Sequence, residues 1–571
     1  MNKMKLLFQF LFIILIPVLL LSCKRKTTSP SNEAISALQL KRGNLISCGQ
    51  ADSEFGTVDF DMSCNADVKK DFNLAIELLH SFEYDEAEKV FAKIIDKSPG
   101  CAMAYWGVAM SNFHPLWNPP TEAELKKGAN AVAIANSIQA KSDREAGYIN
   151  AIGLFYKDWA KNDHHARCVY FEKAMEQLHT KYPDDSEAAI FYALALDASA
   201  VPTDKTYTNQ KKAGDILNAL YKSEPNHPGI IHYIIHTYDY PGLAQFALTA
   251  ARKYAQVAPS SAHALHMPSH IFTRLGLWDE AIHSNQQSVT AAQCYAEQAA
   301  LRGHWEEELH GLDYLVYAYL QKGNNKLAEE QVKYLYGINA FYPFNFKVAY
   351  SVAAIPARYV LENKTWKEGA VLPLPKGNFS WDAFPWQEAI VHFTRVLGAI
   401  HIGDAVKAKD ELAKLQQLKD TLDKQKDSYK SKEVAIQIKA GEAWLQFSQG
   451  NKASAISELM LAANMEDSTE KHPVTPGKVL PTRELLGDLL MQAKQYKPAL
   501  EAYEAVLVKN PNRFNSLYSA GLAAENLGDK QKTAFYFKQL LVIADTVNAD
   551  RPEIKTAQLF LQTHKDMAST Q

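Results

Sequence analysis

Residues 480–513, LPTRELLGDLLMQAKQYKPALEAYEAVLVKNPNR, carry the pattern that decides the fold of this chain. Apolar residues recur at three- and four-residue spacing on both sides of a polar centre, which predicts two helices. Gly487 is the eighth residue of the stretch, Ala499 the 20th, Tyr503 the 24th and Pro511 the 32nd. Small residues at positions 8 and 20 let the two helices approach closely, and the aromatic side chain fills the gap to the next pair. The stretch is therefore expected to fold as a helical hairpin that stacks on its neighbours.

The same spacing recurs with a period of 34 residues. Residues 514–547 place Gly521 and Phe537 at positions 8 and 24, and residues 68–101 place Phe91 at position 24. Further pairs of a turn glycine and a helix alanine occur at Gly276/Ala281, Gly323/Ala328, Gly403/Ala408 and Gly450/Ala455. Strand-like alternation is almost absent. A long helical chain with such an internal period is expected to be a repeat protein.

The repeated unit resembles the tetratricopeptide repeat (TPR), and the resemblance covers most of the chain from about residue 68 to residue 547. It implies an all-α fold, an α-α superhelix or solenoid of helical hairpins with a concave groove. It also implies other proteins or peptides as partners in that groove. Because repeats of this kind are scaffolds, the resemblance specifies no reaction.

The first residues of the chain resemble a bacterial lipoprotein signal. Lys3 and Lys5 precede an apolar run that is too short to predict a membrane span and that ends at Cys23. The tetrad from Leu20 to Cys23 resembles a lipobox, in which the signal peptide is cut before the cysteine and the thiol is acylated. The resemblance implies a membrane partner through lipidated Cys23, in the bacterial cell envelope, and Lys24 favours the outer membrane over the inner. The alternative is an ordinary signal peptide followed by a stray cysteine.

The chain is too long for one hydrophobic core, so an extended or multidomain architecture is expected. We expect a lipoprotein signal peptide at 1–22, a flexible tether and N-terminal segment at 23–63, an N-terminal superhelix with a histidine-rich groove at 64–345, an irregular seam at 346–385, and a C-terminal superhelix at 386–571. The seam contains VLPLPKGNFSWDAFPW, which is rich in proline, glycine and aromatic residues. A net charge of −3 without a long basic block indicates no nucleic-acid partner.

Export makes disulfides possible in this protein. Five cysteines follow Cys23, and an odd number leaves at least one thiol unpaired. Cys64 and Cys101 are the favoured pair, because both precede helices that are expected to lie side by side. Cys48 could replace either of them.

Histidines repeat with the same period near the middle of the chain. Four of them hold positions 5 and 9 of the successive units 228–261 and 262–295: His232, His236, His266 and His270. These units are defined by their proline, glycine and alanine signals without reference to histidine. Positions 5 and 9 are one helical turn apart, so each pair shares a helix face. Neighbouring helices pack about 10 Å apart, so the two pairs could meet at a common ion.

Four more side chains fall at groove positions of these two units and of a third unit, which follows an insertion of about a dozen residues and is set by Gly323 and Ala328. His263 and His310 hold position 2, Asp239 holds position 12 and Asp313 holds position 5. In the TPR family, positions 2, 5, 9, 12 and 13 of the first helix line the concave groove. The resemblance therefore implies that all eight side chains face one cavity.

Three interpretations of this set remain open. A metal site of imidazoles and carboxylates suits a divalent transition metal, namely zinc, copper, nickel or iron. The four additional side chains would complete its shell or form a second site, and the aspartates could instead orient the rings. A polar pocket would bind a carboxylate, a phosphate or a peptide terminus. Buried hydrogen bonds between helices would give the histidines a structural role. The metal site is favoured, in a membrane-anchored binding protein.

The alternatives to a binding protein are a metal-dependent enzyme and a plain protein-assembly scaffold. Glu306 and Glu307 precede His310 by about one helical turn, so either could be a catalytic base beside a metal-bound water. A solvated acidic first turn is the favoured explanation for these glutamates. The sequence contains no glycine-rich phosphate loop and no nucleophile elbow.

Pro268 lies between His266 and His270, inside the expected first helix of its unit. Proline removes one helical hydrogen bond and clashes with the preceding turn. The helix is therefore expected to kink or to restart at Pro268. Such a kink could aim the two neighbouring histidines at one point.

Overall fold

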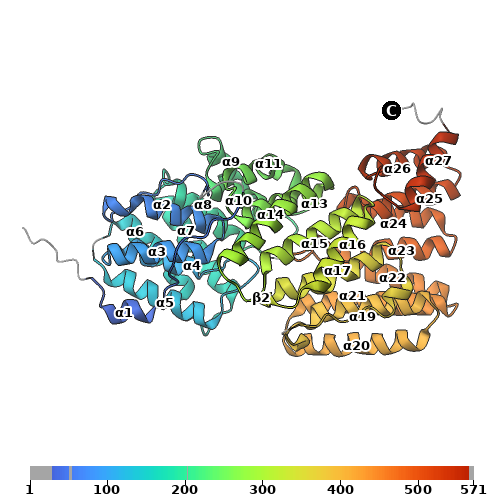
Figure 1. Cartoon of the computed structure of the whole chain (residues 1–571), viewed down its shortest axis with the longest axis horizontal. Helices are drawn as coiled ribbons and strands as arrows, with labels where there is room; N and C mark the ends of the chain where they lie inside the picture. The colour runs from blue at the N-terminus through green and yellow to red at the C-terminus, as the bar shows by residue number, and fades with distance from the viewer. Residues whose placement is uncertain (1–28, 50–53, 140, 202–203, 378, 565–571) are drawn as a thin grey trace, which may run out of the picture.

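Stacked α-helices make up an elongated body, with the N-terminal hairpins at one end and the C-terminal hairpins at the other (Figure 1). The structure is a computed structural model and describes residues 29–49, 54–139, 141–201, 204–377 and 379–564. Within these ranges two parallel strands of two residues each, β1 (His304–Trp305) and β2 (Phe341–Tyr342), are the only extended elements. The all-α fold expected from the sequence is confirmed.

Consecutive helices of the N-terminal part pack as hairpins. The pairs are α2 (Lys69–His80) with α3 (Tyr84–Lys97), α4 (Ala102–Ser111) with α5 (Glu122–Ser137), α6 (Asp143–Tyr156) with α7 (His164–Lys181), α8 (Ser186–Ala198) with α9 (Thr208–Tyr221), and α10 (Pro228–Thr237) with α11 (Leu248–Val257). The short helix α1 (Asn32–Ala37) and the 3-10 turn η1 (Ala66–Val68) precede them, and η2 (Ala244–Ala247) joins α10 to α11.

The middle of the chain continues the stack with one interrupted helix. The elements are α12 (Ala262–His266), α13 (Pro268–Leu275), α14 (Trp278–Gln298), α15 (Glu306–Gln321), α16 (Asn325–Gly337), α17 (Phe346–Glu362), α18 (Trp366–Gly369) and the 3-10 turn η3 (Trp381–Ala383). Gly276 ends α13 with a φ of 65°, a left-handed conformation that glycine adopts without strain. The first part of the expected seam at 346–385 is a regular helix, and irregular chain is confined to the part after α18.

The C-terminal hairpins show why the repeat pattern produces this packing. They are α19 (Pro385–His401) with α20 (Ala405–Lys424), α21 (Ser428–Ser448) with α22 (Lys452–Asp467), α23 (Thr482–Gln492) with α24 (Tyr496–Lys509), and α25 (Phe514–Asn526) with α26 (Lys530–Ile543), followed by α27 (Pro552–Thr563). A Cβ atom on Gly487 would lie 2.5 Å from the Tyr503 ring, and one on Gly521 would lie 2.4 Å from the Phe537 ring. Each glycine therefore lies against the aromatic ring of its paired helix, as the repeat requires.

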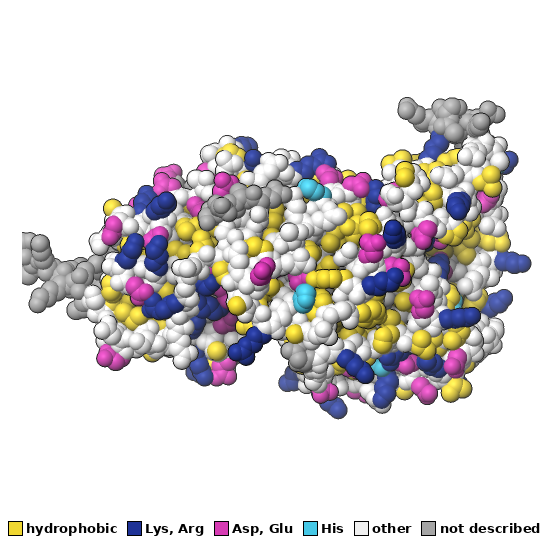
Figure 2. All heavy atoms as spheres, viewed as in Figure 1, with side chains coloured by type: hydrophobic (Ala, Val, Ile, Leu, Met, Phe, Trp, Pro, Cys, Tyr) yellow, Lys and Arg dark blue, Asp and Glu magenta, His cyan; other side chains and the backbone are white. Residues whose placement is uncertain are grey.

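Contacts between distant parts of the chain join the middle of the stack to the C-terminal hairpins. The indole N–H of Trp278 donates to the Asn512 carbonyl at 2.8 Å, and the Asp545 backbone N–H donates to the Lys322 carbonyl at 2.9 Å. The six histidines predicted to lie in the groove are at most 8% exposed. The face in Figure 2 shows histidine at only a few separate places. None of the helices in the described part of the chain has the length and apolar character needed to cross a bilayer.

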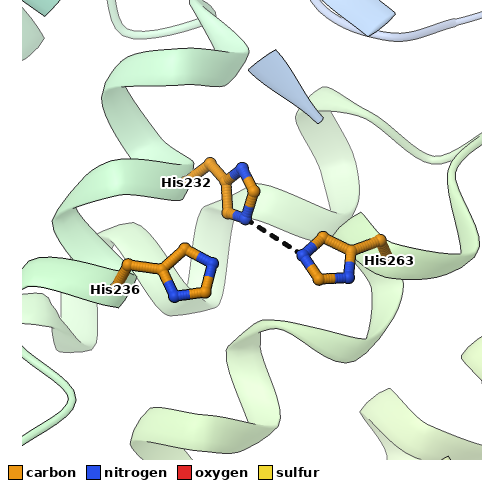
Figure 3. A group of neighbouring side chains, drawn as sticks. All are labelled: His232, His236 and His263. Carbon is orange, nitrogen blue, oxygen red and sulfur yellow. Dashed lines mark hydrogen bonds between the residues drawn. The ribbon is translucent and has the colours of Figure 1, made fainter. Parts of the chain in front are cut away.

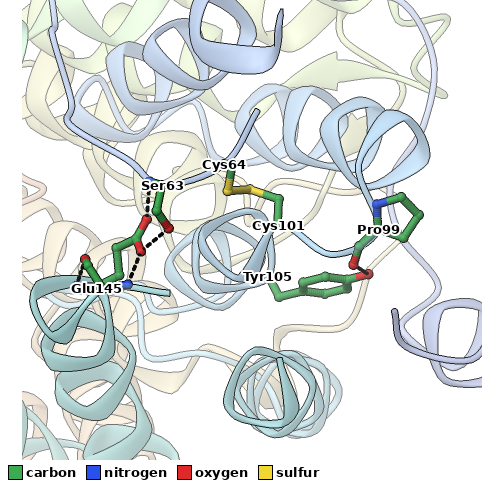
Figure 4. Close-up of a disulfide and its surroundings, with 7 residues drawn as sticks. Ser63, Cys64, Pro99, Cys101, Tyr105 and Glu145 are labelled. Atoms are coloured by element: carbon green, nitrogen blue, oxygen red, sulfur yellow. Dashed lines mark hydrogen bonds between the residues drawn. A yellow bond between two sulfur atoms is a disulfide. The ribbon is translucent and has the colours of Figure 1, made fainter. Parts of the chain in front are cut away.

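A disulfide joins Cys64 to Cys101, the pair favoured in the sequence (Figure 4). Beside it, the backbone N–H of Ser63 donates to a carboxylate oxygen of Glu145 at 2.7 Å. Cys168 is a buried free thiol. The end of the N-terminal segment is therefore fixed to the starts of α4 and α6.

A second disulfide, Cys48–Cys294, spans 246 residues and fastens the N-terminal segment to α14. Along the same route, the Glu54 backbone N–H donates to the Ser260 hydroxyl at 2.9 Å, and the Ser260 N–H donates to the Glu54 carbonyl at 3.2 Å. The N-terminal segment that follows the expected tether is thus held against the repeats where the structure describes it. Cys23 and the signal peptide lie outside the described residues.

We expect the Cys48→Ser/Cys294→Ser variant to lose about 2–4 kcal/mol of unfolding free energy, because the bond closes a long loop in the unfolded chain. Urea unfolding followed by tryptophan fluorescence measures the change. The Cys168→Ala variant, which removes the buried free thiol, controls for the general effect of removing sulfur. An unchanged unfolding midpoint in the double variant would contradict the expectation.

Candidate metal centre

Helix α10 presents His232 and His236 one turn apart toward the inner face of the superhelix. It begins at Pro228, whose missing N–H costs nothing at the first helical position. A Cβ atom on Gly229 would lie 2.4 Å from Nδ1 of His80, so glycine is needed where α10 packs against α2. This close approach brings the His80 backbone carbonyl within hydrogen-bonding distance of the His232 ring.

The helix break expected at Pro268 is confirmed. Helix α12 ends at His266 and α13 begins at Pro268. The proline is thus the first residue of a helix, a position at which no backbone N–H is needed for a helical hydrogen bond. His266 lies in the last turn of α12 and His270 in the first turn of α13. Their Nε2 atoms are 3.1 Å apart.

The first triad consists of His232, His236 and His263, whose rings converge from α10 and α12 (Figure 3). One ring nitrogen from each lies within 4.8 Å of the other two, and all three residues are buried. Nε2 of His232 is 3.2 Å from Nε2 of His263. Nε2 of His236 is buried and has no hydrogen-bond partner among the described residues.

The second triad consists of His266, His270 and His310, from α12, α13 and α15. One ring nitrogen from each of these residues lies within 4.8 Å of the other two, and the His266 and His310 ring centroids are 4.2 Å apart. The Tyr314 hydroxyl is 3.4 Å from Nδ1 and 3.3 Å from Nε2 of His270. Each His270 nitrogen has a closer partner than this hydroxyl: Asp239 at 3.0 Å from Nδ1 and His266 at 3.1 Å from Nε2.

Hydrogen bonds at Nδ1 determine the tautomers of the second triad. His266 Nδ1 donates to the Asn285 Oδ1 atom at 2.6 Å, and the Asn285 amide is oriented by its own bond to the Ala281 carbonyl at 2.7 Å. His270 Nδ1 donates to the Asp239 carboxylate at 3.0 Å. A neutral imidazole carries one proton, so the proton at Nδ1 leaves a lone pair at Nε2. The two Nε2 lone pairs of this triad therefore face each other.

The first triad has a similar arrangement. His232 Nδ1 donates to the His80 carbonyl, which can only accept, so His232 Nε2 also carries a lone pair. His263 Nδ1 lies 3.7 Å from the Glu307 carboxylate, which favours a proton on that nitrogen. Ring nitrogens bound by backbone carbonyls and carboxylates are typical of histidines that bind a metal through the other nitrogen.

Facing lone pairs in a buried site repel unless a cation lies between them. A proton is disfavoured, because burial lowers the pKa values of both His266 and His270. The neighbouring His270 lowers the pKa of His266 further, whereas Asp239 offsets part of the lowering at His270. A metal ion fits this geometry. Two nitrogens that bind the same ion at about 2.0–2.1 Å lie about 2.9–3.4 Å from each other when the nitrogen–metal–nitrogen angle is between a right angle and the tetrahedral angle. The observed separations of 3.1 Å and 3.2 Å fall in this range.

Asp239 orients a ring and also carries a fixed charge. Its carboxylate accepts from His270, from Arg274 Nε at 2.7 Å and from Lys471 Nζ at 3.2 Å. Although burial opposes ionisation, Lys471 and Arg274 hold the pKa of Asp239 well below its usual range. Of the two roles left open for Asp239, its contacts match the orienting role.

Asp313 is not brought to the histidines, because its carboxylate pairs with buried Arg358 at 3.1 Å. Glu306 pairs with Lys347 at 3.3 Å, and Glu307 is bound by the same ammonium group. Glu307 is only 8% exposed, so the solvated first turn favoured in the sequence does not describe it. Burial disfavours the ionised Glu307 carboxylate, but Lys347 and His263 nevertheless hold its pKa well below the usual range. Glu307 thus remains beside His263, whereas Asp313 and Glu306 serve other contacts.

A third buried group, His80, Glu187 and His227, has a different character. The Glu187 carboxylate accepts from His80 Nε2 at 2.9 Å and from His227 Nε2 at 3.0 Å. The Tyr233 hydroxyl then donates to His80 Nδ1 at 3.0 Å. In this group both Nε2 atoms are bound to one carboxylate, so no two ring lone pairs face each other, and Nδ1 of His227 is buried without a hydrogen-bond partner among the described residues.

A cavity of about 420 Å³ reaches the first triad. Its wall includes His236, Asp239, Trp117 and Tyr240, together with His472 from the loop after α22. The cavity therefore gives a small molecule access to one edge of the histidine cluster.

Sequence reasoning missed three residues that support the triads: Asn285, Arg274 and Lys471. Asn285 and Arg274 lie in the same hairpin as His266 and His270, so a search for polar residues on the packed faces of that hairpin could have found them. Lys471 comes from a loop 232 residues after Asp239, and no local pattern points to it.

The comparisons with known proteins are limited. No protein-family model matches the sequence, and no curated protein matches it. A solved structure of a monomeric IFIT1 mutant with m7Gppp-AAAA is similar over 90% of this chain and 100% of that chain, with 12% sequence identity and a TM-score of 0.31. The hairpin packing described above places this chain among helical-repeat proteins of the TPR type.

Proposed function

We propose that this protein is a TPR-type binding protein of the bacterial envelope that holds transition-metal ions at two histidine triads on the inner face of its superhelix. The observation that carries the proposal is the pair of Nε2 lone pairs of His266 and His270, which face each other at 3.1 Å in a buried site. Ligands that are all imidazole suit zinc, copper, nickel or iron.

Elemental analysis of the purified protein tests this proposal. We expect bound transition metal, and we expect the His232→Ala/His266→Ala variant to retain less than a tenth of it, because one ligand is lost from each triad. The His227→Ala variant removes a buried histidine from the third group, in which both rings are bound to Glu187, and should keep its metal. A wild-type protein that stays metal-free, and whose stability does not change on adding zinc or copper, would overturn the proposal.

The anchor is the second part of the proposal. The lipobox-like tetrad ending at Cys23 and the two disulfides both suit an exported protein. Mass spectrometry of the N-terminal peptide should find acylated Cys23, and the Cys23→Ala variant should leave the membrane fraction. Outer-membrane rather than inner-membrane fractionation is expected from Lys24.

A metal-dependent enzyme is the second candidate, and one observation favours it: the cavity reaches His236. Three protein ligands with one open position are typical of catalytic sites, whereas structural sites are closed. A scaffold also suits protein or peptide partners. If the His232→Ala/His266→Ala variant still captures the same partners in a pull-down, those partners bind the scaffold and not the histidines.

A further inference from the structure

The geometry points to a paired metal centre, in which each triad holds one ion and the two ions share a small bridging ligand that enters through the cavity beside His236. This inference rests on the proposed function and adds to it the number of ions, their coupling and the route of access.

The ligand geometry calls for two ions. The ring nitrogens of each triad lie within 4.8 Å of one another, but the six histidines do not form a single group at that limit. A single ion with bonds of about 2.0–2.1 Å could therefore not bind all six rings without a rearrangement of buried helices. Each triad has its own close Nε2 pair, at 3.2 Å and 3.1 Å.

The two triads are also adjacent. The His236 and His270 ring centroids, which belong to different triads, are 6.3 Å apart. This is almost the same as the separation of His236 from His263 within the first triad, 6.2 Å, and of His270 from His310 within the second, 6.1 Å. The boundary between the triads is thus about as wide as the triads themselves. Two ions held by adjacent triads would form a pair of the kind that shares a ligand, in which the metals are about 3.5–4 Å apart.

The neighbouring carboxylates leave room for an exogenous ligand. Asp239 is occupied by His270, Arg274 and Lys471. Glu307 binds Lys347 through Oε1, and its buried Oε2 lies 3.7 Å from Nδ1 of His263, the nitrogen that does not face His232. Three imidazoles then leave at least one open position on each ion. A shared anion at these positions would offset part of the charge that two cations bring into a buried site.

The cavity supplies the route to these positions. His236 belongs to the first triad and also lines the cavity, together with Trp117 and the Asp197 carboxyl. Its volume of about 420 Å³ is ample for a small anion. A bulky side chain at Ala198, another wall residue at the end of α8, would narrow this route without touching a histidine.

Copper loading of the full chain tests the inference. The metal-depleted protein is titrated with Cu²⁺, with and without azide as the bridging probe, and both copper content and the integrated electron paramagnetic resonance signal are measured. We expect two copper ions per chain and, with azide, far less than two spins, because a bridging ligand couples the two unpaired electrons. One copper per chain, or two coppers with two full spins in the presence of azide, would overturn the paired centre.

Two variants sharpen the result. His310→Ala should leave one tightly bound copper per chain with one full spin, because only the second triad is broken. Ala198→Trp should keep both coppers but slow the azide reaction at least tenfold, and an unchanged rate would refute access through the cavity. A wild-type chain that binds no copper refutes the proposed function as well, whereas one ion or two independent ions refute only the pairing.

Discussion

The Arg513→Ala variant is expected to lose about 3–5 kcal/mol of unfolding free energy, because it leaves buried carboxylates without their cation. Arg513 is fully buried and precedes α25. Its guanidinium donates to both carboxylate oxygens of Glu484, at 2.7 Å and 2.9 Å, and lies 2.6 Å from the Glu362 carboxylate. The three side chains join α17, α23 and the start of α25, so the loss should weaken the packing of the C-terminal hairpins on the middle of the chain.

Urea unfolding measures this loss, and a triple variant provides the matched control. Arg513→Met/Glu484→Gln/Glu362→Gln removes the cation together with both charges, so no buried charge is left unpaired. Replacing a buried ion pair by neutral groups of similar size is often close to neutral for stability. We expect the triple variant to recover most of the lost stability. A loss below about 1 kcal/mol for Arg513→Ala, the value typical of an exposed pair, would show that the network is dispensable.

The metal-free protein is expected to lose stability steeply as the pH falls below about 6.5, the ordinary pKa of histidine. Burial, reinforced in most cases by neighbouring histidines, lowers the pKa values of five triad members: His232, His236, His266, His270 and His310. Between about pH 6.5 and these lowered pKa values the unfolded chain binds protons that the folded chain excludes. These histidines therefore lower the free energy of unfolding as the pH decreases, by up to about 1.4 kcal/mol per pH unit for each histidine. Burial raises the pKa values of Glu77, Glu83 and Asp197 to about 7, 8 and 7, so these carboxyls oppose part of the loss.

Urea unfolding of chelator-treated protein at pH values between 7.5 and 5 measures this slope. Saturating zinc should move the loss of stability to lower pH, because a metal-bound imidazole resists protonation. The His266→Gln/His310→Gln variant should show a shallower slope, since two of the buried groups no longer titrate. Asp239 and Glu307, whose pKa values are lowered, affect stability only at more acidic pH. A stability that is flat across this range would contradict the expectation.

The fold could be predicted from the sequence because it depends on local contacts that repeat. The contact of Gly487 with Tyr503 joins residues of one hairpin, so a 34-residue pattern contains all the information needed. The break at Pro268 could be predicted for the same reason, since it follows from one residue and its own helix. The bond between Cys48 and Cys294 could not, because it depends on where the N-terminal segment runs over the finished stack.

The candidate site could be predicted in part. Periodicity placed His232, His236, His266 and His270 on one face, and the structure brings all four together with His263 and His310. The division into two triads could not be predicted, because it depends on the side-chain directions produced by the helix break. The ion pair of Asp313 with Arg358 was hidden for a similar reason, since the arginine comes from the next hairpin.

The Cys48–Cys294 disulfide also decides how mechanical load travels through the molecule. A covalent path leads from residue 48 through the sulfur bridge to residue 294, so tension along it bypasses the chain between them. Hairpins α2/α3 to α10/α11, both helices α12 and α13, and the first triad lie within this bypassed loop. Ahead of the bridge, the backbone N–H groups of Lys41 and Ile46 donate to Glu88 and Glu86 of α3. A pull on the N-terminus is therefore shared between α3 and the end of α14, and the first triad lies off the covalent path.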